Sequence, residues 1–126
     1  MQTYLEQAFA VFCVVVGLSH LVQPREWVAF FTEMSRRPGA ALIISMWTLP
    51  FGVVFGLGHN DWRWGIPLIV TLFGWAWLLK GSIYALYPRV VEIWARPGFL
   101  TPRKFQVGGA LMTAIGLLVG WVAWMP

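Results

Sequence analysis

The stretch that decides the fold is GIPLIVTLFGWAWLLKGSIYALYPR, residues 65–89. Residues 65–87 contain one charged side chain, Lys80, and ~20 apolar residues suffice to cross the hydrocarbon core of a bilayer. The stretch therefore predicts a transmembrane helix that ends at the Tyr-Pro-Arg turn. Lys80 stands out, because an ammonium group in hydrocarbon is costly unless it has a function or reaches the surface.

Three further stretches are long and apolar enough to span a membrane, at about residues 5–22, 40–58 and 105–125. The 126 residues are 59% hydrophobic and 11% charged, whereas a soluble domain is about 25% charged. We therefore expect an all-α integral membrane protein with four transmembrane helices in a single domain, residues 1–126. No basic residue precedes the first span and no cleavage pattern follows it, so we expect that span to be retained.

The basic residues predict the orientation of the chain. The loop after the second span has one of them, Arg63, and the loops after the first and third spans have seven: Arg25, Arg36, Arg37, Arg89, Arg96, Arg103 and Lys104. Loops rich in Lys and Arg stay in the cytoplasm. We expect these two loops to be cytoplasmic in a bacterial inner membrane, with both termini periplasmic. This bias accounts for the net charge of +4 without a nucleic-acid partner.

The two halves of the chain resemble each other at an offset of 64 positions. Pro24-Arg25 falls on Pro88-Arg89, and the other identities pair Phe9 with Phe73, Gly17 with Gly81, Gly52 with Gly116, and Gly56 with Gly120. Glycine and proline dictate backbone shape, so these matches predict an internal repeat, about residues 1–62 and 65–126. Each repeat has two spans, so both insert in the same direction.

Each Pro-Arg pair begins a short segment with apolar residues on one side: Trp27, Phe30, Phe31 and Met34 in the first, and Val90, Val91 and Trp94 in the second. Such a pattern, with Pro in the first turn, predicts a short amphipathic helix that lies in the membrane interface. Pro50 is expected to kink the second span.

Small residues form stripes on the second and fourth spans. The stripes consist of Ser45, Gly52 and Gly56, and of Gly109, Thr113, Gly116 and Gly120. Helices in lipid approach one another closely at such residues. The stripes predict either packing inside one monomer or a seam between two copies.

The second half also resembles a known type of protein. LLKGSIYALYPRVVEIW, residues 78–94, and RKFQVGGALMTAIGLLVG, residues 103–120, resemble the small two-helix inner-membrane proteins of the YjeT type. The resemblance covers about residues 74–122 and implies a two-helix unit with no known catalytic residue. Lys80 stands where that family often has an acidic residue. GLSHLVQPREW, residues 17–27, resembles the start of the DoxX-like four-helix membrane proteins.

Two histidines and one carboxylate are candidate contacts for an ion, a lipid or a partner. His20 and His59 are expected at opposite membrane faces, which excludes one shared metal or haem. The histidines are then expected either to make hydrogen bonds in the interface or to be paired across the symmetry axis of a dimer. His59 and Asp61 belong to the loop GHNDWRWG, residues 58–65, which is either a cation or proton entry point or a capped turn, with Asn60 or Asp61 capping the third span.

Trp75 and Trp77 are expected near the bilayer centre. They either pack in the bundle or line a contact with a subunit, a lipid or a quinone-like pigment. Lys80 is expected to reach the headgroups or a lipid phosphate, or else an acidic partner subunit. Arg25 and Arg89 are further candidate contacts for a lipid, an ion or a partner.

The sequence contains no nucleotide, metal or nucleophile motif, and its single cysteine, Cys13, lies within a span, so we expect no enzyme, cofactor or metal site. We expect an accessory, scaffolding or assembly subunit that contacts other membrane proteins or its own copies through its helices. The alternative is a small transporter or channel for an anion or small solute, with Lys80 in the pathway.

Overall fold

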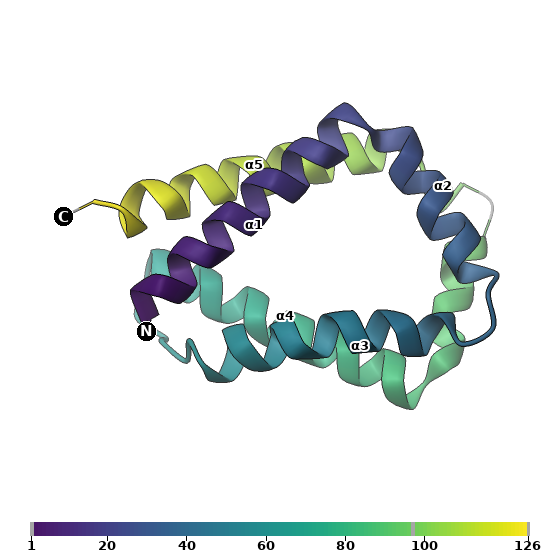
Figure 1. Cartoon of the computed structure of the whole chain (residues 1–126), viewed down its shortest axis with the longest axis horizontal. Helices are drawn as coiled ribbons and strands as arrows, with labels where there is room; N and C mark the ends of the chain where they lie inside the picture. Colours follow the sequence, from purple (N-terminus) through teal and green to yellow (C-terminus); the bar gives the residue numbers. More distant parts are fainter. Residues whose placement is uncertain (1, 97, 126) are drawn as a thin grey trace. The chain divides into compact units, whose positions relative to one another are not determined.

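The structure, a computed structural model, describes residues 2–96 and 98–125. Every regular element among these residues is a helix (Figure 1): α1 Gln2–Val22, α2 Pro24–Ser35, α3 Ala40–Gly52, the π-helix η1 Val53–Leu57, α4 Ile66–Leu86, the 3₁₀-helix η2 Pro88–Ala95 and α5 Pro102–Ala123.

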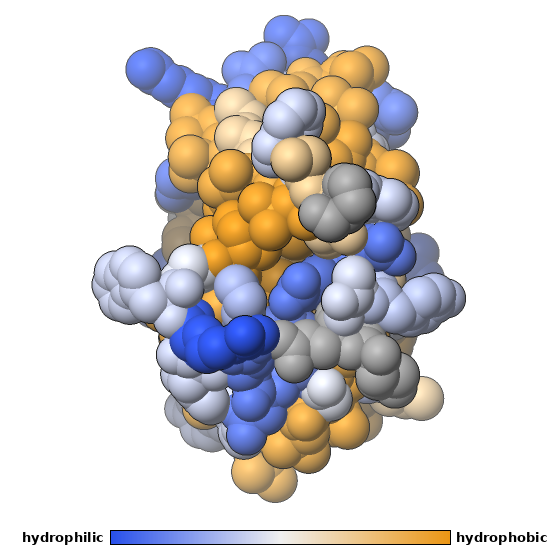
Figure 2. Space-filling model, turned by 90° about the vertical axis from the view of Figure 1, so that its left-hand side faces the viewer, coloured by the Kyte–Doolittle hydropathy of each residue, from blue (hydrophilic) through white to orange (hydrophobic). Residues whose placement is uncertain are grey.

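Four helices are long and apolar enough to cross a membrane. They cover Thr3–Val22, Ala40–Leu57, Ile66–Leu86 and Pro102–Ala123. Much of their exposed surface is made of large apolar side chains such as Val15, Met46 and Leu111. Hydrophobic residues accordingly cover large areas of the face drawn in Figure 2. The prediction of an all-helical chain with four helices of this kind is confirmed.

The chain divides into two compact units. The first, here called the terminal unit, combines residues 3–34 with residues 94–125 and so contains α1, α2 and α5. The second, here called the central unit, comprises residues 35–93, with α3, η1 and α4. In Figure 1, α1 runs beside α5 and α3 runs beside α4. Each pair therefore takes one spanning helix from each half of the sequence.

The helix pair of the terminal unit is held by close backbone approach and a small core. Phe9 and Val119 are fully buried, and Cys13 is 1% exposed. A Cβ atom added at Gly116 would lie 2.9 Å from the Cβ of Cys13 and 2.9 Å from the backbone nitrogen of Val14. The absence of side chains at such positions lets α5 pack directly on α1.

The helix pair of the central unit has a close backbone contact as well. A Cβ atom at Gly52 would clash with the backbone of Trp77 and Leu78. Gly52 and Gly116 are 64 positions apart, and Trp77 and Leu78 follow Cys13 and Val14 by the same offset. The residues on each side of these two contacts are therefore separated by the same 64 positions.

Two more helix contacts are related by the offset of 64 positions. Gly17 on α1 faces Thr113 on α5, and Gly81 on α4 faces Leu49 on α3. Adding 64 to 17 and to 49 gives 81 and 113. The helix boundaries agree too, since α1 ends at Val22 and α4 at Leu86.

Three local features of the backbone bear on the sequence-based expectations. Pro50 lies inside α3, and the helix widens into the π-helix η1 three residues later, at Val53. The segment after Pro88 is a 3₁₀-helix, whereas the one after Pro24 is an α-helix. The N-cap of α4 is Gly65, with no side-chain cap, so the prediction that Asn60 or Asp61 caps this helix is wrong.

Candidate functional site

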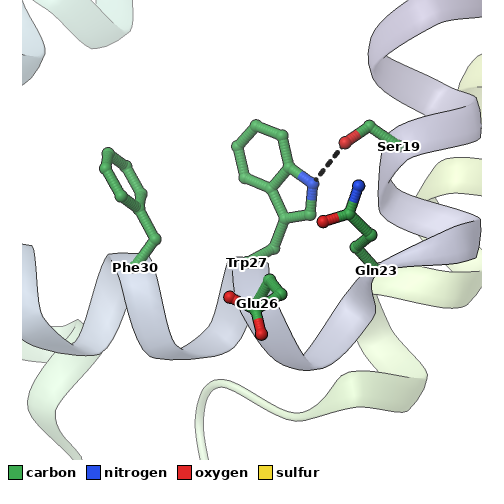
Figure 3. A pocket seen from close by; sticks show the side chains of 5 residues that line it. All are labelled: Ser19, Gln23, Glu26, Trp27 and Phe30. Carbon is green, nitrogen blue, oxygen red and sulfur yellow. Dashed lines mark hydrogen bonds between the residues drawn. The ribbon is translucent and has the colours of Figure 1, made fainter.

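A hollow of about 320 Å³ lies in the terminal unit where α1 meets α2 (Figure 3). The chain turns there because α1 ends at Val22 and α2 begins at Pro24, a residue suited to the first turn of a helix. The turn brings the last part of α1 and the first two turns of α2 around one space. Its lining residues are Ser19, Gln23, Glu26, Trp27 and Phe30.

The indole of Trp27 is held in this hollow by four neighbours, one of which is Phe31, whose ring stacks on it with 5.8 Å between centroids. The indole Nε1–H donates a hydrogen bond to the Oγ of Ser19 at 2.9 Å, drawn as a dashed line in Figure 3. The ring of His20 stacks on it, with 4.2 Å between ring centroids, and Phe30 meets it edge-on at 6.3 Å. One wall of the hollow is therefore an aromatic ring that its neighbours hold in place.

His20 contacts both the indole of Trp27 and the backbone of its own helix. Its Nδ1 lies 2.7 Å from the carbonyl oxygen of Val16, so this nitrogen carries a proton and donates it. The imidazole lies between Trp27 and Phe105, whose centroid is 5.2 Å away. Phe105 in turn stacks on Phe31 at 5.7 Å. These rings tie α2 to α1 and α5.

Glu26 supplies the only charge among the five lining residues. Its side chain is exposed, as is that of Gln23, and neither Lys nor Arg lines the hollow. The neighbouring Arg25 is also exposed but lies outside the lining. A carboxylate beside aromatic rings favours a cation, because the face of an aromatic ring attracts positive charge.

A second polar cluster lies in the central unit, around the fully buried hydroxyl of Thr71. This hydroxyl accepts a hydrogen bond from the backbone N–H of Asp61 at 3.1 Å. It lies 2.6 Å and 2.7 Å from the carbonyl oxygens of His59 and Asp61, and one of these receives its proton. The Nδ1 of His59, a residue only 1% exposed, is 3.0 Å away. Thr71 thus fastens the loop 58–65 onto α4.

The charges of this loop are compensated locally. The Nε and Nη2 of Arg63 donate to the carboxylate of Asp61 at 3.0 Å and 2.7 Å, and the backbone N–H of Arg63 donates at 3.0 Å. The amide oxygen of Asn60 accepts from the Nε1–H of Trp62 at 2.6 Å and of Trp75 at 3.4 Å. These bonds fold the loop back on itself and on α4.

The tryptophans of α4 pack within the central unit. Trp75 reaches the loop through Asn60, as described above. The indole of Trp77 meets Phe51, Phe55 and Phe73 edge-on, with centroid separations of 6.1, 5.9 and 6.2 Å. Both rings therefore have partners in their own unit.

The small-residue stripes also face partners within the chain. Gly109, Gly116 and Gly120 point at α1, while Gly52 and Gly56 point at α4. The other two members, Ser45 and Thr113, are buried and half-buried respectively, and Thr113 Oγ1 donates to the carbonyl of Gly109 at 2.7 Å.

Lys80 lies in α4, and its side chain is exposed. Among residues 2–96 and 98–125, no hydrogen-bonding or ion-pairing group meets its ammonium nitrogen. The nearest interaction is with the ring of Tyr84, whose centroid is 5.7 Å from Nζ. Arg89, which follows Pro88, is exposed as well.

Sequence reasoning missed Ser19 and Gln23 as members of a site. They precede Trp27 by eight and four positions, but the chain turns between Val22 and Pro24, so this spacing does not by itself place them beside Trp27. The role of Thr71 had no signal in the sequence either, because its partners lie ten and twelve positions earlier, in a loop.

Comparisons of the chain with protein-family models, with curated proteins and with solved structures found no match. Within the part of the chain that the structure describes, no three His, Cys, Asp or Glu residues are grouped so that they could hold a metal ion.

Proposed function

We propose that this protein is a non-enzymatic accessory, scaffolding or assembly subunit, which contacts other membrane proteins or its own copies through its helices. The observation that carries the proposal is Lys80, an exposed lysine on a helix that is long and apolar enough to span a membrane. Within the described residues its ammonium group has no acidic partner.

An ammonium group within a bilayer is costly, and beyond the ring of Tyr84 the described residues offer Lys80 no partner. A lipid phosphate reached by snorkelling is one group that could meet the charge, and a carboxylate on another membrane protein is another. Lys80 is seven residues before Tyr87, hence ~10 Å from the end of its helix at 1.5 Å per residue. At that depth the carboxylate of a partner helix meets the charge with less distortion of the side chain.

The internal packing supports a role for the outward faces. Gly52 of α3 packs against α4, and Gly109 and Gly116 of α5 pack against α1, so the closest approaches of each helix pair lie within the chain. Large apolar side chains remain exposed on α3, including Trp47 at 68%. Such faces, together with Lys80, are the surface that we assign to partner helices.

We further propose that the chain arose by duplication of a two-span unit and that its helix pairs exchange partners between the two copies. The equivalent contacts of Gly52 and Gly116 support this history. We place α2 and η2 in the cytoplasmic interface and both termini in the periplasm of a bacterial inner membrane, because the basic loops follow α1 and α4. The resemblance to YjeT-type and DoxX-like proteins stays a prediction.

Affinity purification from native membranes in mild detergent tests the proposed function. We expect the wild-type protein to retain a membrane-protein partner, or a second copy, in fixed ratio. We expect Lys80→Met to lose it, while Arg89→Met, which removes an exposed charge beyond the helix end, keeps it. Recovery of wild type only as a lone monomer would contradict the proposal.

Flux measurements separate this role from the transporter alternative. Liposomes that contain the wild-type protein are expected to show no more flux of chloride or potassium than empty ones. Flux that disappears in Lys80→Met would assign the lysine to a transport pathway instead.

A further inference from the structure

The hollow between α1 and α2 has no part in the proposed function, yet it gathers three polar side chains beside two aromatic ones (Figure 3). The polar groups are the hydroxyl of Ser19, the amide of Gln23 and the carboxylate of Glu26. Their grouping around the turn between α1 and α2 calls for a ligand or a structural reason.

A structural reason is weakened by the second half of the chain. The positions 64 further on from Ser19 and Glu26 are Ile83 and Val90. There the chain also leaves a spanning helix, at Leu86, and begins a short helix at a proline, Pro88. The turn after a spanning helix therefore forms without these polar groups.

The chemistry of the lining favours a cation that donates hydrogen bonds. Glu26 provides the negative charge, and the oxygen of the Gln23 amide is a further acceptor. The Ser19 oxygen uses one lone pair for the indole of Trp27 and keeps a second. The exposed ring of Phe30 adds the attraction of an aromatic face for positive charge.

The place and size of the hollow point to a lipid headgroup. It lies where a helix capable of spanning the membrane ends and an amphipathic helix with exposed charges begins, which is where headgroups lie. Its volume of about 320 Å³ is near the lower end of the range of about 300–1,000 Å³ for small-molecule sites. That space suits one headgroup and not the acyl chains.

We propose that this hollow binds the primary ammonium group of an ethanolamine phospholipid. A primary ammonium has three N–H donors for the oxygens of Glu26, Gln23 and Ser19. A choline headgroup carries a positive charge but no N–H, so it gains only the attraction of the carboxylate and the aromatic ring.

Native mass spectrometry of the full-length protein with defined lipids tests this assignment. The probes are phospholipids with equal acyl chains and ethanolamine, choline or glycerol headgroups. We expect the ethanolamine lipid to bind about fivefold more tightly than the choline lipid, as for a polar interaction of ~1 kcal/mol at a partly exposed site. Equal affinity of wild type for all three would overturn the proposal.

Variants on α2 locate the site. Glu26→Gln is expected to abolish the preference for ethanolamine, whereas Glu33→Gln, an equal loss of charge on the same helix outside the hollow, leaves it unchanged. Ser19→Ala is the second variant and should reduce the preference with an intact carboxylate. Equal effects of Glu26→Gln and Glu33→Gln would show that general surface charge sets the preference, and would refute the site.

Soluble phosphoethanolamine distinguishes a lipid from a free amine. We expect millimolar phosphoethanolamine to leave the bound lipid in place, because it lacks the acyl chains that hold a lipid at the interface. Displacement of the bound lipid by phosphoethanolamine at this concentration would identify the ligand as a soluble amine and overturn the lipid assignment.

Discussion

Two adjacent glycines of α5 offer a controlled test of the helix pair in the terminal unit. A Cβ atom added at Gly109 would lie 2.7 Å from the carbonyl oxygen of Gly17 and 2.7 Å from the Cβ of His20. At Gly108, the next residue, it would meet no atom within 4 Å. Gly109→Ala and Gly108→Ala therefore make the same chemical change, the first inside the contact between α1 and α5 and the second outside it.

The magnitude follows from the separations. Carbon atoms pack best at about 3.5–4.0 Å, so alanine at position 109 requires α1 and α5 to move apart by roughly 1 Å. Such overpacking costs about 1–3 kcal/mol. Alanine also favours a helix over glycine by about 1 kcal/mol, but this gain is common to both variants and cancels in their comparison. We expect Gly109→Ala to be less stable than Gly108→Ala by about 1–3 kcal/mol.

Unfolding in mixed micelles measures this difference. The protein in mild detergent is titrated with sodium dodecyl sulphate and followed by tryptophan fluorescence and circular dichroism, with wild type alongside. Equal free energies of unfolding for the two variants would refute the packing of α5 on α1 through Gly109.

Two further predictions concern the helix pairs. A Cβ atom at Gly120 would lie 3.4 Å from the Cβ of Ala10, close to the ~3.5–4.5 Å between the Cβ atoms of a disulfide. The double variant Ala10→Cys with Gly120→Cys, made in a Cys13→Ala background, should therefore form an intrachain disulfide in native membranes. Persistence of two free thiols under oxidant, seen by gel shift, would contradict it. Thr71→Val should lower the free energy of unfolding by about 1–3 kcal/mol, because it removes the hydrogen bonds that the buried hydroxyl of Thr71 makes with residues 59 and 61. A change below about 0.5 kcal/mol, as for ordinary surface substitutions, would argue against that role.

The spanning helices could be predicted because length and the near absence of charge decide them. The expected span 65–87 differs from α4, Ile66–Leu86, by one residue at each end. The partner of each helix could not be predicted in the same way. A glycine such as Gly116 indicates that some helix approaches closely, and it contains no information about which one.

The candidate site was only partly predictable for a related reason. Trp27 and Phe30 could be assigned to an amphipathic segment from their spacing. Whether that segment turns its rings toward Ser19 depends on the direction of the chain between Val22 and Pro24, which residue types alone do not set. Lys80 could be singled out at once, because a charge within an apolar stretch is visible in any sequence.

Photocrosslinking beside Lys80 tests the proposed function most directly. Ile83 follows Lys80 by three positions on α4, is 40% exposed, and accepts a photoreactive side chain such as benzoylphenylalanine without entering the core. On irradiation of native membranes we expect one defined protein adduct, absent when Lys80→Met is added. Adducts with lipid alone, in both backgrounds, would contradict the assignment of this surface to a partner membrane protein.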